Sequence, residues 1–221
     1  MTRFENFTKE LQKSTPQLQI KFKNESFLMK LLGWVLYLIN PKFSTTYTTT
    51  IGSTIYFPNR EFIDKFPHQS LTILAHEYLH IQDTKRLGKF VFSCLYLFPL
   101  ILLPLIPLVW LFFNWLYATI FLVVCSLPWP AWGRKYLELR AYQMSLFMLY
   151  VLGMENGMVL EVEKTIDRIN TNFTTSMYYW MWPFGVKNSL RDFYHTKLNT
   201  MASSDVIYKE ILSALEKSKS I

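Results

Sequence analysis

Residues 71–80 read Leu-Thr-Ile-Leu-Ala-His-Glu-Tyr-Leu-His and contain the pattern His-Glu-x-x-His. Apolar residues recur with helical spacing over about residues 67–85, which predicts that the pattern lies on one helix. Side chains four residues apart lie one turn apart on the same helix face, so the imidazoles of His76 and His80 can reach one zinc ion. Glu77 can reach a water molecule bound to that ion. The motif therefore predicts a zinc site with His76 and His80 as ligands and Glu77 as the general base.

A catalytic zinc site has a third protein ligand and keeps its fourth position for water. No third histidine follows His80 at the short spacing of the metzincin pattern, so a later carboxylate or histidine has to serve. Glu138 stands among apolar residues on a helix predicted over residues 135–152, where a lone carboxylate needs a partner. We therefore predict Glu138 as the third ligand, the alternative being an exposed Glu138 paired with Lys135 or Arg134. The other candidates for this ligand are Glu155, Glu161 and His195.

Residues 90–133 contain no Asp, Glu, Lys or Arg. A helix needs about 20 residues to cross a bilayer, so this stretch suffices for two. Pro104 and Pro107 lie in its middle, where a turn between two helices is expected. The stretch predicts an inserted two-helix hairpin, transmembrane or re-entrant, with the lipid bilayer as a partner. The alternative is a very apolar hairpin buried within a soluble protein.

The two ends of this hairpin must lie on the same side of the membrane if His80 and Glu138 are to share an ion. Short basic groups flank the hairpin, at residues 85–89 before it and 134–135 after it. Under the positive-inside rule these groups place both ends on the cytoplasmic side. The sequence thus predicts an integral membrane protein whose active site faces the cytoplasm.

The other segments predict further helices and a small β-hairpin. Residues 27–39 are apolar but too few to cross a bilayer, and predict a helix in the core or at an interface. Residues 44–57 are rich in Thr, Tyr and Ile, which favours a β-hairpin or a kinked strand. Short helices are predicted over residues 159–169 and from about Asp205, with an aromatic loop over 178–185 between them.

The composition narrows the class of protein. With 51% apolar and 17% aromatic residues, the 221-residue chain is not disordered, and membrane contact is favoured. The net charge of +7 is spread along the chain, and no nucleic-acid-binding module is recognisable. We therefore expect the positive side chains to face a membrane surface, and we expect no nucleic-acid partner. Cys94 and Cys125 both fall inside the apolar run, which predicts neither a disulfide nor a thiolate metal site. Residues 1–26 lack the apolar centre of a cleavable signal peptide.

The order of these motifs resembles that of the membrane-embedded gluzincin peptidases, the class of the CAAX prenyl proteases and the heat-shock membrane protease HtpX. In that family His-Glu-x-x-His is followed by membrane helices and then by Glu-x-x-Ala-Asp, which supplies the third ligand. Here the corresponding segments are residues 76–80, the apolar run, and residues 138–142 (Glu-Leu-Arg-Ala-Tyr). The resemblance covers about residues 45–145. It implies zinc-dependent hydrolysis of a peptide or protein substrate, and an edge strand within residues 50–57 that pairs with extended substrate.

One position departs from the family pattern. The family's aspartate four residues after the third ligand, which orients a zinc-binding histidine, is Tyr142 here. Tyrosine accepts a hydrogen bond but supplies no charge, so the groups that orient the ligands must differ. Asp83, three residues after His80, is a candidate replacement, and a solvated Asp83 is the alternative.

Together these features predict one metallopeptidase domain over residues 1–221. Its predicted fold class is α+β: mostly helical and gluzincin-like, with a small β-hairpin and a membrane hairpin inserted at residues 90–133. Its predicted cofactor is Zn²⁺, held by His76, His80 and Glu138. One alternative is a non-catalytic membrane protein with a structural or vestigial zinc site, marked by a fourth protein ligand; another is a membrane-disrupting or scaffold protein with an accidental motif. Candidates by residue type alone for stabilising the oxyanion are His195, Tyr178, Tyr179 and Arg191, with packing or surface contact as the alternative for each.

Overall fold

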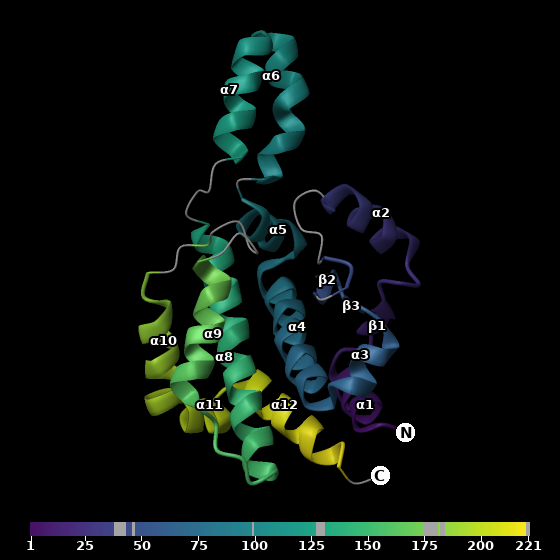
Figure 1. The fold of residues 1–221 in the computed structure, drawn as a ribbon, viewed down its shortest axis with the longest axis vertical. Helices are drawn as coiled ribbons and strands as arrows, with labels where there is room; N and C mark the ends of the chain where they lie inside the picture. Colours follow the sequence, from purple (N-terminus) through teal and green to yellow (C-terminus); the bar gives the residue numbers. More distant parts are fainter. Residues whose placement is uncertain are drawn as a thin grey trace.

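The computed structural model describes residues 1–37, 43–45, 47–98, 100–126, 131–174, 181 and 184–219. These residues form a mostly helical fold with a small three-stranded sheet (Figure 1). In chain order the elements are α1 (Arg3–Ser14), β1 (Gln19–Phe22), α2 (Phe27–Leu36), β2 (Thr49–Ile51), β3 (Thr54–Phe57), α3 (Arg60–Lys65), α4 (Pro67–Leu87), α5 (Lys89–Leu97), the 3-10 helix η1 (Leu100–Leu105), α6 (Ile106–Phe112), α7 (Trp115–Ser126), α8 (Trp132–Glu155), α9 (Val162–Thr174), α10 (Val186–Asp192), the π-helical turn η3 (Phe193–Lys197), α11 (Leu198–Ser204) and α12 (Val206–Lys217).

Helices α4 and α8 pack against each other in the middle of the molecule (Figure 1). They confirm the helices predicted over residues 67–85 and 135–152. Proline occupies the first turn of α4, where its missing N–H costs nothing, and Gly88 follows the last residue with a φ of 81°. Apolar side chains of both helices belong to one buried cluster, which includes Leu71, Leu74 and Ala75 from α4 and Ala141, Met144 and Met148 from α8.

The remaining helices cover this pair. Helices α1 and α12 contact each other, and α1 also packs on α4. The side chain of Thr2 accepts a hydrogen bond from the backbone of Glu5 and thereby caps α1. On the other side, α9 and α10 lie together against α8. The helices predicted near residues 27–39, near 159–169 and from Asp205 are α2, α9 and α12, whereas most of the predicted aromatic loop at 178–185 lies outside the described residues.

The sheet has the strand order β1-β3-β2. Strands β2 and β3 are antiparallel and are joined at Gly52, whose φ is 61°, so the predicted β-hairpin is confirmed. Strand β1 pairs with β3 in parallel and was not predicted. Ile55 and Phe57 of β3 are buried in the core, and β2 lies at the edge of the sheet, next to α4.

Within the uncharged run of residues 90–133, η1, α6 and α7 form an arm that projects from the helical body (top of Figure 1), whereas α5 packs on α4 and α8. Within the described part of the chain, no helix is both long and apolar enough to span a membrane. The predictions of a membrane-crossing hairpin and of an integral membrane protein with a cytoplasmic active site are therefore wrong.

The membrane prediction fails because the uncharged run is divided into several short helices. α5, η1, α6 and α7 have 9, 6, 7 and 12 residues. At about 1.5 Å per residue even α7 is roughly 18 Å long, against about 30 Å of bilayer hydrocarbon. Pro107 lies in the first turn of α6, which begins at Ile106. The side-chain oxygen of Asn114 accepts hydrogen bonds from the backbone N–H groups of Leu116 and Tyr117 and so starts α7 separately. The arm keeps large apolar side chains exposed, among them Trp110, Leu111, Phe112 and Trp115.

Candidate metal centre

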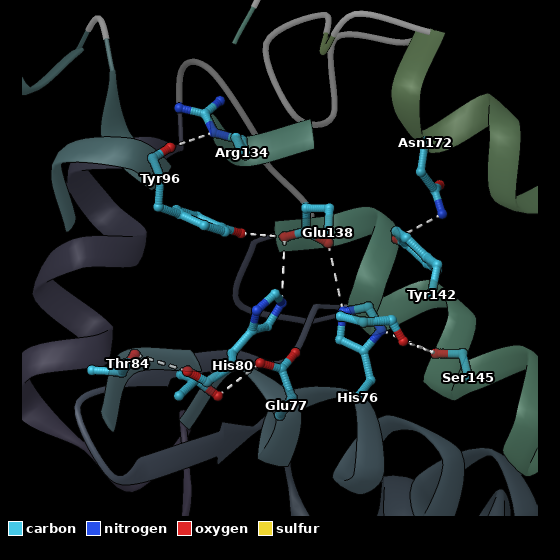
Figure 2. Close-up of polar contacts among 12 residues, drawn as sticks. His76, Glu77, His80, Thr84, Tyr96, Arg134, Glu138, Tyr142, Ser145 and Asn172 are labelled. Carbon is cyan, nitrogen blue, oxygen red and sulfur yellow. Dashed lines mark hydrogen bonds and ion pairs between the residues drawn. The ribbon is translucent and has the colours of Figure 1, made fainter. Parts of the chain in front are cut away.

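The three predicted ligands lie together between α4 and α8 (Figure 2). One nitrogen each of His76 and His80 and one carboxylate oxygen of Glu138 all lie within 4.8 Å of one another. The Nε2 atom of His76 is 3.6 Å from Oε2 of Glu138, and Nε2 of His80 is 3.6 Å from Oε1. All three residues are buried, and Glu138 is only 1% exposed. This is the one group of three or more potential ligands found among the described residues.

The polar atoms of the cluster fit a metal ion. Oε2 of Glu138 and Nδ1 of His80 are buried and have no hydrogen-bond partner. A buried carboxylate oxygen left without a partner costs free energy that a bound cation offsets. Two imidazole nitrogens and one carboxylate oxygen also form the ligand set of a class of catalytic zinc sites with an open fourth position.

Ser145 of α8 determines which ring nitrogen of His76 faces the cluster. Oγ of Ser145 lies 3.0 Å from Nδ1 of His76 and donates its own proton to the carbonyl of Ala141 at 3.2 Å. Ser145 therefore accepts a hydrogen bond from Nδ1–H. The lone pair of His76 is then on Nε2, which points at Glu138 and is the atom that would bind a metal.

The position at which the sequence departs from the family pattern also lies beside His76. The ring of Tyr142 packs edge-on against the imidazole of His76 with centroids 4.8 Å apart, and Asn172 donates a hydrogen bond of 2.8 Å to the Tyr142 hydroxyl. Tyr142 thus supports His76 by packing and adds no charge. Asp83 is buried and forms an ion pair with Arg140, so the alternative of a solvated Asp83 is wrong. It does not hydrogen-bond to Nδ1 of His80, which has no partner.

Glu138 is a carboxylate in this environment. Burial alone would raise its pKa, but the facing imidazoles of His76 and His80 outweigh burial and lower the pKa of Glu138 to about 2. Burial likewise favours neutral imidazoles, and it lowers the pKa of His80. For His76 the nearby Glu138 carboxylate outweighs burial, and the pKa of His76 is raised. The cluster therefore presents one negative charge and two basic nitrogens to the same point.

The predicted general base lies at the border of this buried cluster. Glu77 is half-buried and follows His76 on α4. The hydroxyl of Thr50, on the edge strand β2, donates a hydrogen bond of 2.7 Å to Oε2 of Glu77. The edge strand and the carboxylate are therefore physically joined.

Helix α5 forms a further wall of the cluster that the sequence did not indicate. The hydroxyl of Tyr96 donates a hydrogen bond of 2.5 Å to Oε1 of Glu138 (Figure 2). Burial and the charge of Glu138 raise the pKa of Tyr96 well above its usual value of 10, so this hydroxyl keeps its proton. No charge or hydropathy signal marks this tyrosine, because it lies inside a run that is apolar throughout.

The alternatives for the third ligand are engaged elsewhere. Glu138 itself is not an exposed partner of Lys135, whose ammonium donates to the carbonyl of Phe184 at 2.5 Å. Glu155 forms ion pairs with Arg3 and Lys219, and the exposed Glu161 forms one with Lys164.

Two of the four candidates for oxyanion stabilisation are described by the structure, and both contact residues outside the cluster. Arg191 forms an ion pair with Glu163, and the ring of His195 packs edge-on against that of Tyr194 at 5.2 Å. Tyr178 and Tyr179 lie outside the described residues.

Comparison of the chain with protein-family models, curated proteins and solved structures finds no match. The resemblance to the gluzincin peptidases therefore rests on the motif residues alone and stays a prediction. What the chain can do has to be argued from the geometry of the cluster.

Proposed function

We propose that the chain is a zinc-dependent metalloendopeptidase. The observation that carries this proposal is the buried group of His76, His80 and Glu138 with the Glu77 carboxylate at its border. Zinc bound to these residues would lower the pKa of a water molecule to about 7 and polarise a peptide carbonyl. Glu77 would remove the proton from the attacking water and return it to the departing amine.

The edge strand β2 supports a peptide as the substrate. Among the described residues β2 pairs only with β3, so the backbone groups of its outer edge are available to an extended peptide. Thr50 of this strand holds Glu77, so a peptide added along β2 passes beside the general base. A reacting carbonyl has to lie within hydrogen-bonding reach of that base and its water.

The rival function is a structural zinc site, whose mark is a fourth protein ligand. The cluster found in the described part of the chain contains three His, Cys, Asp or Glu residues and no fourth. Three protein ligands leave one position for water, as in catalytic sites. This count favours the peptidase over a structural site.

The test of the function is Glu77→Gln. The substitution keeps the three proposed ligands and removes the base, so we expect bound zinc to be retained and cleavage to fall by about 10²–10⁴-fold. Zinc content is measured on the purified protein, and cleavage is measured with fluorescently labelled casein and a mixed peptide library. The matched control is Glu161→Gln, which removes the same charge at an exposed site. Wild-type cleavage by the Glu77→Gln protein refutes the mechanism, and zinc-loaded wild type that cleaves neither probe counts against the function.

A further inference from the structure

We propose that Tyr96 is a positioning residue of the metal centre: its hydroxyl fixes the carboxylate of Glu138 in the orientation that a metal ion needs. The inference deepens the proposed function and rests on its metal site, but not on peptidase activity. Tyr96 comes from α5 and Glu138 from α8, so the contact joins two elements at the cluster.

The two carboxylate oxygens of Glu138 have different surroundings. Oε1 accepts the 2.5 Å hydrogen bond from Tyr96, whereas Oε2 is buried and has no hydrogen-bond partner. A carboxylate held at one oxygen by a neutral donor keeps its negative charge and cannot rotate freely. Metal-binding carboxylates are generally held by hydrogen bonds of this kind, which fix ligand geometry before the metal binds. Tyr96 thus leaves Oε2 as the oxygen without a hydrogen bond, 3.6 Å from Nε2 of His76.

The orientation of His80 is not fixed by a hydrogen bond to its outer nitrogen, Nδ1. Nδ1 of His80 has no partner, in contrast to Nδ1 of His76, which is held by Ser145. The rings of Phe92 and Tyr96 stack on each other at 5.7 Å, and both meet the His80 ring edge-on, at 6.1 and 5.9 Å. Packing against α5 therefore orients the ligand that lacks a hydrogen bond.

Helix α8 also holds α5 at Tyr96 itself. Nε of Arg134 donates a hydrogen bond of 2.6 Å to the backbone carbonyl of Tyr96. That carbonyl lies in the last turn of α5, where carbonyls have no partner within the helix and a cation is favourable. Gly133 lies so close that an added Cβ would meet the carbonyl oxygen of Leu95 at 2.7 Å. The first turn of α8 thus holds Tyr96, the donor of the hydrogen bond to Glu138. The acceptor, Glu138, lies one turn further along the same helix.

The test is Tyr96→Phe, which keeps the ring against His80 and removes only the hydroxyl. We expect zinc affinity, measured by competition with a chromophoric chelator, to fall by about 10–100-fold, the usual loss when a residue that orients a metal ligand is changed. The visible absorption of the Co²⁺-loaded protein should also change, because it reports ligand geometry. A loss of packing alone would leave the Co²⁺ spectrum of the folded protein as in wild type.

The matched control is Tyr142→Phe. Tyr142 also packs against a histidine of the cluster, and its hydroxyl accepts a hydrogen bond from Asn172. We expect its zinc affinity to stay within about twofold of wild type. A second variant, Gly133→Ala, displaces α5 without removing a polar group and should weaken zinc binding as well.

The outcomes separate this inference from the proposed function. Wild-type zinc affinity and Co²⁺ spectrum in Tyr96→Phe overturn the inference, and so does an equal loss of affinity in Tyr142→Phe. Wild-type protein that binds zinc but cleaves no peptide counts against the proposed function. The zinc-affinity and Co²⁺ measurements on Tyr96→Phe still decide the role of Tyr96. Wild-type protein that binds no zinc overturns the metal centre itself.

Discussion

The hydroxyl of Thr50 donates a hydrogen bond to Oε2 of Glu77, so a residue of the edge strand holds the carboxylate beside the histidine pair. The contact links the place where a peptide can pair with the sheet to the place where a proton has to be removed. The hydrogen bond also restricts the rotation of the Glu77 side chain, which is half-buried and is not one of the three proposed metal ligands.

We expect Thr50→Val to lower the rate of peptide cleavage about tenfold while zinc content stays unchanged. Valine keeps the shape of threonine and removes the hydroxyl, and a hydrogen bond to a charged group contributes about 1.5–3 kcal/mol. The steady-state rate with labelled casein measures the effect. Thr49→Val is the control, because neighbouring side chains of a strand point to opposite faces. Equal losses in both variants would mean that the strand, and not the hydrogen bond, is responsible.

Ser145→Ala should weaken zinc binding about 10–100-fold, because Nδ1 of His76 loses the acceptor that keeps the lone pair on Nε2. Chelator competition measures the change. The control is Ser70→Ala, another buried serine, whose Oγ has no hydrogen-bond partner. Removing that hydroxyl should leave zinc affinity unchanged. If Ser145→Ala binds zinc as tightly as wild type, His76 does not depend on Ser145 for its tautomer.

The stability of the metal-free protein should depend on pH through Glu138. The folded-state pKa of Glu138 is lowered from 4.5 to about 2, so its contribution to stability is present above pH 4.5 and is lost as the pH falls towards 2. Thermal unfolding between pH 6 and pH 2.5 with a chelator present should show a steep loss in wild type and a shallower one in Glu138→Gln. Equal slopes would mean that Glu138 is not a buried carboxylate facing the histidines.

Much of the candidate site could be predicted from the sequence, because the histidine pair is local in the chain and the third ligand has an unusual setting. The four-residue spacing of His76 and His80 fixes their side chains on one helix face, and a lone glutamate among apolar residues identifies Glu138. The periodicity of apolar residues likewise predicts the two helices that carry them.

The contacts that complete the site could not be predicted, because they join residues far apart in the chain. The hydroxyl of Tyr96 reaches Glu138 from another helix, and Thr50 reaches Glu77 from a strand. The membrane prediction failed for a related reason. Composition measures how apolar residues 90–133 are, but it does not show that the side chain of Asn114 starts a separate short helix in their middle.

The arm is attached to the body at one place. Helices α6 and α7 pack on each other and on η1, and the arm joins the body where Gly133 of α8 meets Leu95 of α5. Because these two residues are in contact, the ends of the arm lie close together. A short Gly-Ser linker in place of residues 99–130 should therefore leave α5, α8 and zinc affinity as in wild type.

The same replacement removes the exposed side chains of Trp110, Phe112 and Trp115. Contiguous exposed apolar surface favours association, so we expect the shortened protein to sediment as a smaller species than the full chain at equal concentration. Triple replacement of these three residues by serine is the matched control, since it keeps the arm and removes its apolar surface. It should reduce association to a similar extent. Loss of zinc binding in the shortened protein but not in the triple variant would show that the arm itself, and not only α5, supports the metal centre.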